Sequence, residues 1–151
     1  MDATDLRILG ALVDNARITY SDLAEHIGLS GPSTAERVRK LEERGVIRAY
    51  SAVVDPELLG RGLTALVAVT LESPAFRGPF IEGIRKLTGV VECHHVAGDD
   101  DYLVKVYVNG TRGLEVFVSE HLKVLPGVAR TRTTVVLSTP LERPFSPKPT
   151  P

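Results

Sequence analysis

The sequence contains little cysteine and no large excess of charge of either sign. Its single cysteine, Cys93, excludes an internal disulfide and a cysteine-rich zinc site, and it suits a reducing cytoplasm. The formal net charge of −1 argues against a protein that coats nucleic acid by charge alone. The acidic start at residues 1–5 lacks the features of a signal peptide, and no apolar run approaches the roughly 18–20 residues of a membrane span. We expect a cytoplasmic protein with no membrane partner.

The motifs of common enzyme classes are also missing. No nucleophile–base pair and no phosphate-binding glycine loop of the Walker type occurs, and the adjacent pair His94-His95 is the only histidine arrangement that calls for comment. Neighbouring residues of a strand point to opposite faces, so these two side chains cannot serve one site from a regular strand. We therefore predict no catalytic residue, no metal and no cofactor, and we expect Cys93 to be a small buried apolar residue.

Three short helices are predicted in the first 44 residues. The second helix is expected to begin at a Ser21 cap and to end at Gly28, a residue that tolerates the left-handed conformation. Ser30 can cap the third helix, and Pro32 then lies in its first turn, where a missing N–H costs nothing. The first helix is expected over residues 4–15, with an apolar face made of Leu6, Ile8, Leu9, Leu12 and Val13.

The third helix, residues 33–44, is the candidate recognition helix of a helix-turn-helix. Its apolar positions Ala35, Val38 and Leu41 are expected to face inward. Hydroxyls and basic side chains on the outer face of such a helix can read base edges in the major groove of double-stranded DNA. The predicted DNA-binding residues are Ser33, Thr34, Arg37, Lys40 and Arg44. The alternative is an amphipathic helix pair with a solvated charged face, because three glutamates share the helix.

Two changes in sequence pattern follow the third helix. Residues 46–54 are β-prone and predict a strand or wing, whereas Asp55-Pro56 and Gly60-Arg61-Gly62 indicate a flexible junction. We expect a DNA-binding domain with its linker strand over residues 1–54 and a second domain over residues 62–138. The proline-rich tail, residues 140–151, is expected to be disordered.

The second domain shows the order β-α-β-β-α-β. Four strands and two helices in this order predict a ferredoxin-like α+β sandwich, whose sheet is covered on one face and open on the other. We expect the open face to find a partner. The strands are predicted at residues 64–71, 90–96, 102–108 and 128–138, and the helices at residues 79–87 and 111–124, the latter with a Thr111 cap.

The loop Gly98-Asp99-Asp100-Asp101 is the second candidate site. Glycine and aspartate are common in polar turns for conformational reasons, so the loop can be a simple connection between strands. Three adjacent carboxylates also suggest a cation site, but no ligand spacing resembles a calcium loop. The residues alone therefore do not decide between a simple turn and a binding site.

Many short stretches, in order along residues 2–137, resemble the leucine-responsive regulatory protein (Lrp/AsnC) family of transcription regulators. In the first half they are Asp5-Leu6-Arg7-Ile8-Leu9, Asp22-Leu23-Ala24, Gly28-Leu29-Ser30, Arg37-Val38, Leu41-Glu42, Gly45-Val46-Ile47 and Tyr50. In the second half they are Val91-Glu92-Cys93, Gly98, Asp101-Tyr102-Leu103, Leu125-Pro126-Gly127-Val128, Thr131 and Thr133.

The resemblance implies a winged helix-turn-helix followed by a RAM/ACT-like domain that senses a small molecule, usually an amino acid. It also implies a homodimer, formed by pairing of the C-terminal sheets, that assembles further into a tetramer or octamer. The implied effector-binding residues are Gly98, Asp99, Asp100, Asp101, Thr131 and Thr133. Asp100 departs from the aromatic residue that is frequent in the family at this position.

Two alternatives fit the same scaffold. Siroheme decarboxylases are similar to this family and carry histidines in the C-terminal domain, but their DNA-reading unit is degraded, whereas Ser33, Thr34, Arg37 and Lys40 are present here. An architectural DNA-binding protein without a ligand is the other alternative. We predict a transcription regulator that responds to an amino acid or a related metabolite.

Overall fold

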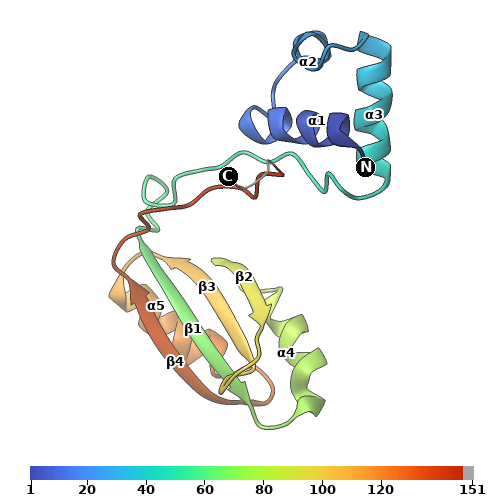
Figure 1. The fold of residues 1–151 in the computed structure, drawn as a ribbon. Coiled ribbons are helices and arrows are strands. Elements are labelled where there is room, and N and C mark those ends of the chain that lie inside the picture. The colour runs from blue at the N-terminus through green and yellow to red at the C-terminus, as the bar shows by residue number, and fades with distance from the viewer. Residues whose placement is uncertain (148–151) are drawn as a thin grey trace. The chain divides into compact units, whose positions relative to one another are not determined.

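The computed structural model describes residues 1–147 and divides the chain into two units, shown in Figure 1. The first unit contains residues 1–53 together with the tail from residue 141, and the second contains residues 54–140.

Three helices form the first unit: α1 (Ala3–Asp14), α2 (Tyr20–Ile27) and α3 (Gly31–Glu43). Each begins at a residue whose side chain accepts a hydrogen bond from the first turn. The expected cap Ser30 and the expected helix end at Gly28, with φ of +78°, are confirmed. The expected Ser21 cap is wrong: Thr19 caps α2, because its Oγ1 accepts from the backbone N–H of Asp22. The unit's core consists of Ile8, Leu23, Ile27, Val38 and Leu41.

The segment after α3 does not form the predicted strand or wing. Residues 46–54 have no strand partner among the residues that the structure describes, and a strand without a partner leaves its backbone groups unpaired. A side-chain contact links the middle of the segment to α3 instead, since the Tyr50 hydroxyl donates to Glu42 Oε1 at 2.8 Å. Burial, together with this contact, raises the pKa of Tyr50 to about 12.

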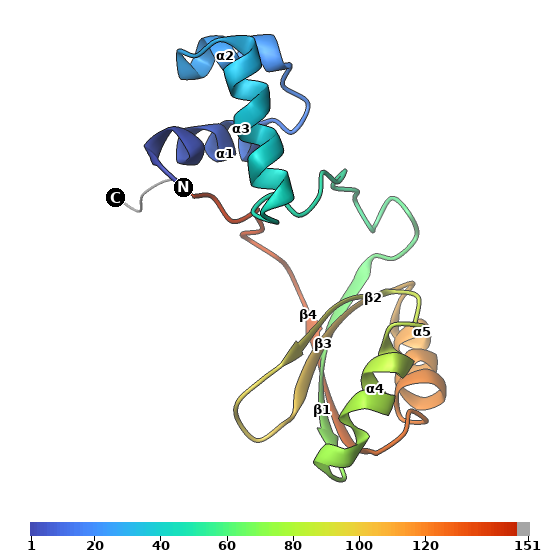
Figure 2. The ribbon, with the colours of Figure 1, turned by 90° about the vertical axis from the view of Figure 1, so that its right-hand side faces the viewer.

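The second unit is a four-stranded antiparallel sheet with helices on one face, as Figure 2 shows. The strands lie in the order β2-β3-β1-β4, which confirms the ferredoxin-like prediction. Strand β1 is central and pairs with both β3 and β4. The elements are β1 (Leu63–Leu71), α4 (Arg77–Ile84), β2 (Val90–His95), β3 (Tyr102–Val108), α5 (Thr111–Val116) and β4 (Val128–Val136).

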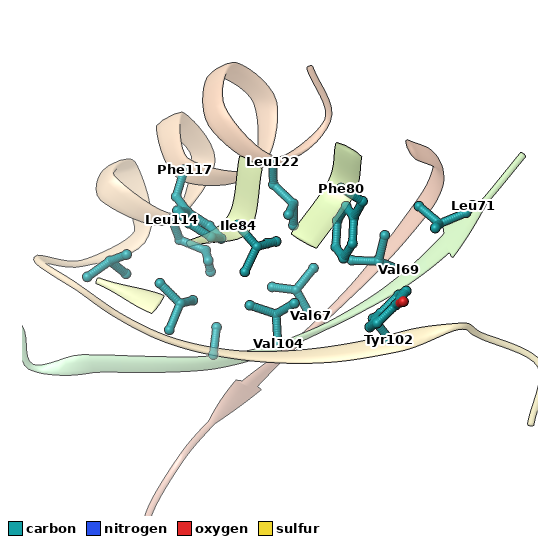
Figure 3. Packing of buried hydrophobic residues seen from close by; sticks show 13 residues of the cluster. Val67, Val69, Leu71, Phe80, Ile84, Tyr102, Val104, Leu114, Phe117 and Leu122 are labelled. Carbon is teal, nitrogen blue, oxygen red and sulfur yellow. The ribbon is translucent and has the colours of Figure 1, made fainter. Parts of the chain in front are cut away.

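Alternating residues of the central strands build the core of this unit. Val67 and Val69 of β1 and Val104 of β3 are completely buried, and they pack against Phe80 and Leu122 from the helical layer (Figure 3). Side chains of the opposite parity lie on the other face of the sheet, which we call the open face. Because a sheet residue points either into this core or onto the open face, the register decides which residues can form a site there.

Both helical segments differ in detail from the expectation. A short 3₁₀ turn, Pro74–Phe76, leads into α4, which therefore begins two residues earlier than predicted. Thr111 is the first residue of α5 and not its cap; Gly110 takes the cap position with φ of +125°. The second half of the expected helix is a π-helical segment, Phe117–Leu122.

The described part of the tail contains no helix or strand after β4. Its last four residues, 148–151, lie outside the described residues, so the expected disorder of the tail stays a prediction.

Gly127 provides a test of this architecture. Its φ of +76° is unfavourable for any side chain, and a Cβ at this position would overlap the ring of Phe76. Gly60 has nearly the same φ, +73°, but open space around it. We expect Gly127→Ala to lower the free energy of unfolding by about 1–3 kcal/mol more than Gly60→Ala, because only the first adds a steric clash. Denaturant unfolding followed by circular dichroism measures the difference, and equal losses would contradict the described contact.

Candidate nucleic-acid interface and effector pocket

The buried row of α3 determines which of its side chains can reach DNA. Val38 and Leu41 face inward as predicted, but the third member of the row is Thr34 and not Ala35. Thr34 is fully buried, and its hydroxyl donates to the Ser30 carbonyl at 3.1 Å. This internal hydrogen bond lets a polar residue occupy a core position without an unpaired group. The expectation that Thr34 lies on the outer side is therefore wrong.

The other four predicted DNA-binding residues come together. Ser33, Arg37, Lys40 and Arg44 line one hollow of about 330 Å³, whose remaining lining residues are Asp5, Glu36 and Leu41. Helical spacing of three and four residues places these side chains along one flank of α3. The structure thus gathers a hydroxyl and three basic groups on a single strip.

The glutamates that share this helix partner its basic residues. Arg39 Nη2 lies 2.6 Å from Glu36 Oε1, and Lys40 Nζ lies 3.3 Å from the same oxygen. Arg39 also forms an ion pair with Glu43. The side-chain hydrogen bond from Arg39 is the largest cause that lowers the pKa of Glu36. The net positive charge of the helix surface is consequently smaller than its count of basic residues suggests.

Arg37 is held by two carboxylates at the start of α1. Its Nη1 lies 2.9 Å from Asp2 Oδ2 and 2.7 Å from Asp5 Oδ1. These aspartates also hydrogen-bond each other's backbone N–H groups, and the bonds to the N–H of Asp5 and of Asp2 are the largest causes that lower the pKa of Asp2 and Asp5, respectively. A contact across more than 30 residues of sequence has no local pattern, which is why sequence reasoning missed it.

The acidic loop lies beside the sheet and is fixed by two of its own carboxylates. Asp101 Oδ2 accepts the backbone N–H of Leu71 at 2.8 Å, and the Asp101 N–H donates to the Val69 carbonyl at 2.9 Å. Asp100 Oδ1 accepts the Thr70 hydroxyl at 2.9 Å. Asp99 is exposed, and no polar contact of its carboxylate is found among residues 1–147. The three neighbouring carboxylates therefore have different environments.

Two arginines of β4 meet Asp100 on the open face. Arg132 Nη2 lies 2.7 Å from Asp100 Oδ2, and Arg130 Nη2 lies 3.5 Å from Asp100 Oδ1. The Asp100 side chain is only 9% exposed, whereas both arginines are largely exposed. The loop and Arg132 line a shallow pocket of about 290 Å³, which includes Gly98, Asp99 and Asp100. Sequence reasoning missed these two arginines. Their spacing, Arg130-x-Arg132 on a predicted strand, is the signal that could have found them, since such residues share a face.

Thr131 and Thr133 do not belong to this pocket within one chain. They pair with Val69 and Val67, whose side chains enter the core, so the two threonines lie on the helix-covered side of the sheet. The expectation that they share one side is met, but that side is opposite to the loop pocket. The sequence shows that alternate residues of β4 lie on opposite faces of the sheet. Only the register with β1 shows which of these residues lie on the same face as the loop.

The histidines of β2 diverge as expected. His94 pairs with Leu103 and contacts Glu92 at 2.8 Å, whereas the His95 ring lies 5.0 Å from the ring of Tyr102, a core residue. No cluster of three or more potential metal-binding side chains occurs within the described residues. Cys93 is partly buried, and burial raises the pKa of its thiol.

The three-helix unit and the sandwich with its loop pocket define a class: a regulator that combines a DNA-binding domain with a ligand-binding domain. The family model of the Lrp/AsnC ligand binding domain matches residues 64–144, and that of the winged helix-turn-helix DNA-binding domain matches residues 1–48. The chain belongs to the Lrp/AsnC family of transcription regulators. No helix among the described residues is long and apolar enough to cross a membrane.

Curated relatives extend over nearly the whole chain. The leucine-responsive regulatory protein of Haemophilus influenzae is 40% identical, over 91% of this chain and 84% of the relative. The Bkd operon transcriptional regulator of Pseudomonas aeruginosa is 35% identical over 97% of both chains. Among solved structures, a Neisseria meningitidis transcriptional regulator in complex with L-Met has a TM-score of 0.90, with 30% identity over 95% of this chain and 94% of that chain.

Proposed function

We propose that this regulator reads double-stranded DNA with one flank of α3 and senses an amino acid at the loop pocket of its sheet. The observation that carries the DNA assignment is the strip of Ser33, Arg37, Lys40 and Arg44 beside the buried row of α3. Lys40 and Arg44 are exposed and suited to phosphate or base contacts. Thr34 has no direct part in this proposal, because its side chain is buried.

Lys40→Ala and Arg44→Ala test the DNA assignment. If each contacts a phosphate, each variant should weaken binding to all sequences and reduce the slope of log affinity against log salt by about 1. Fluorescence anisotropy measures this on a duplex that the wild-type protein has selected from random sequence. Lys86→Ala, at an exposed lysine of the second unit, is the control and should bind like the wild type. Unchanged salt slopes for both α3 variants would refute the assignment.

The effector proposal rests on the chemistry of the loop pocket and on relatives. A free amino acid carries a carboxylate, which suits Arg132, and an ammonium group, which suits Asp99. Asp101 supports the loop through Leu71 rather than contacting the ligand, and Asp100 positions the arginines. Methionine is the ligand in the solved complexes of the Neisseria meningitidis regulator and of a Mycobacterium tuberculosis feast or famine regulatory protein.

A thermal-shift screen against the amino acids, followed by variants, tests this pocket. We expect at least one amino acid to raise the melting temperature of the wild type, and Arg132→Ala or Asp99→Ala to weaken its binding tenfold or more, since a charged hydrogen bond contributes about 1.5–3 kcal/mol. Glu115→Ala on α5 is the control at an exposed carboxylate away from the pocket. No response to any amino acid would favour a ligand-independent architectural protein.

We further propose that the open face pairs with a second copy, giving a homodimer and, from it, tetramers or octamers. Leu66 and Leu103 lie on this face and are only half-buried within one chain. Their apolar area would leave water on pairing, which favours association.

A charge at the centre of the open face tests the assembly. Leu66→Lys should shift the protein toward monomer in size-exclusion chromatography with light scattering, because pairing of the open faces would take the new ammonium group out of water without a partner. Val135→Lys changes an already exposed residue on the helix-covered side and should leave the mass unchanged. If the Leu66→Lys variant keeps the wild-type mass, the interface lies elsewhere.

We propose no catalytic activity for this chain. The curated relatives reported above are regulators, and the histidines that suggested a decarboxylase point to opposite faces. A regulator of transcription acts where the chromosome lies, and we therefore propose a cytoplasmic location.

A further inference from the structure

Arg37 completes a closed set of hydrogen bonds at the start of α1. Asp2 Oδ1 accepts the N–H of Asp5 at 2.8 Å, and Asp5 Oδ2 accepts the N–H of Asp2 at 2.9 Å. The other oxygen of each carboxylate accepts from Arg37 Nη1. All four carboxylate oxygens of this capping box are thus in use, and one nitrogen of α3 bridges both acids.

The contact of Arg37 with Asp2 and Asp5 lies where it can determine the orientation of α3 relative to α1. The core residues of the first unit hold α1 and α3 together, but apolar contacts are non-directional and set orientation weakly. Charge-assisted hydrogen bonds are directional. The Asp5 side chain is 12% exposed and that of Arg37 35% exposed, whereas that of Asp2 is 55% exposed, so the bond to Asp5 is the part of the bridge that is shielded from water. It lies on the flank of α3 that also carries Lys40 and Arg44.

We propose that Arg37 is a positioning residue: it fixes the recognition helix on the N-terminus of α1 and thereby determines how α3 meets DNA, without contacting a base itself. This inference rests on the proposed function, in which α3 reads DNA. The lowered pKa values of Asp2 and Asp5 agree with a bridge that persists at neutral pH.

Asp5→Asn separates positioning from base contact. The amide side chain of this variant would keep an oxygen for the Asp2 N–H but would lose the negative charge opposite Arg37. If Arg37 positions α3, Asp5→Asn and Arg37→Ala should each reduce affinity for the selected duplex by about fivefold or more. The double variant should bind no more weakly than the weaker single variant, because both changes break the same bridge. If Arg37 contacts a base, Asp5→Asn should instead leave affinity unchanged or raise it, since the guanidinium is freed.

Arg37→Lys gives a second discrimination. Because a single guanidinium nitrogen forms both bonds, one ammonium group can replace it, and we expect most of the affinity and the preference over a scrambled duplex to return. A two-nitrogen contact to guanine would be lost in this variant. Arg39→Ala is the matched control, because its ion pairs remain within α3.

Hydrogen exchange of the Asp5 amide provides the readout inside the protein. Exchange should quicken in Arg37→Ala and Asp5→Asn and stay as in the wild type in Arg39→Ala. Circular dichroism establishes whether each variant is folded. If Arg37→Ala does not fold, Asp5→Asn and Arg37→Lys still test the proposal. The inference would be overturned if Asp5→Asn bound DNA as tightly as the wild type or more tightly. It would also be overturned if the fold-loss in affinity of the double variant equalled the product of the two single losses. A failure of the proposed function itself would look different. The wild type would then not bind DNA, or Lys40→Ala would show the same salt dependence of DNA affinity as the wild type.

Discussion

The second unit depends on the burial of one face of its sheet under two helical segments. Val67, Val69 and Val104 are completely buried on that face and hold the strands in a single register. A shift by one residue would move this whole set to water, so the register is strongly determined. The same constraint fixes what the opposite face presents: Thr70, Arg130 and Arg132 meet the acidic loop there because their neighbours are committed to the core.

The first unit is organised by a smaller core, and polar contacts therefore carry more of its geometry. The buried cluster that holds its three helices together has five apolar side chains. Caps at Asp2, Thr19 and Ser30 satisfy the first turns, and the buried hydroxyl of Thr34 is bonded within its own helix. Carboxylates then partner most of the basic groups of α3. Binding of DNA would have to compete with these internal ion pairs, which lowers non-specific attraction and leaves discrimination to geometry.

The element types followed from local patterns, and the site details did not. Helical spacing and caps near Ser30 and Gly28 predicted the helix pair, and strand alternation predicted β3 with its observed bounds. By contrast, Thr34 and Ala35 fit the same helical stripe almost equally well, and only packing decides which of them is buried. Thr131 and Thr133 could not be assigned to a face without the pairing of β4 with β1. The predicted strand at residues 46–54 needs a partner that local sequence cannot provide.

In the proposed mode of DNA reading, the anchoring of α3 at Asp2 would couple the first turn of α1 to DNA recognition. The ammonium group of Met1 lies 4.0 Å from Asp5 Oδ2, within the same group of charges that holds Arg37. Acetylation of this amine would remove a positive charge there, and a fusion peptide would move the charge away and add bulk beside the bridge. DNA recognition is therefore best measured with untagged protein, because the tail from residue 141 belongs to the same unit as α1.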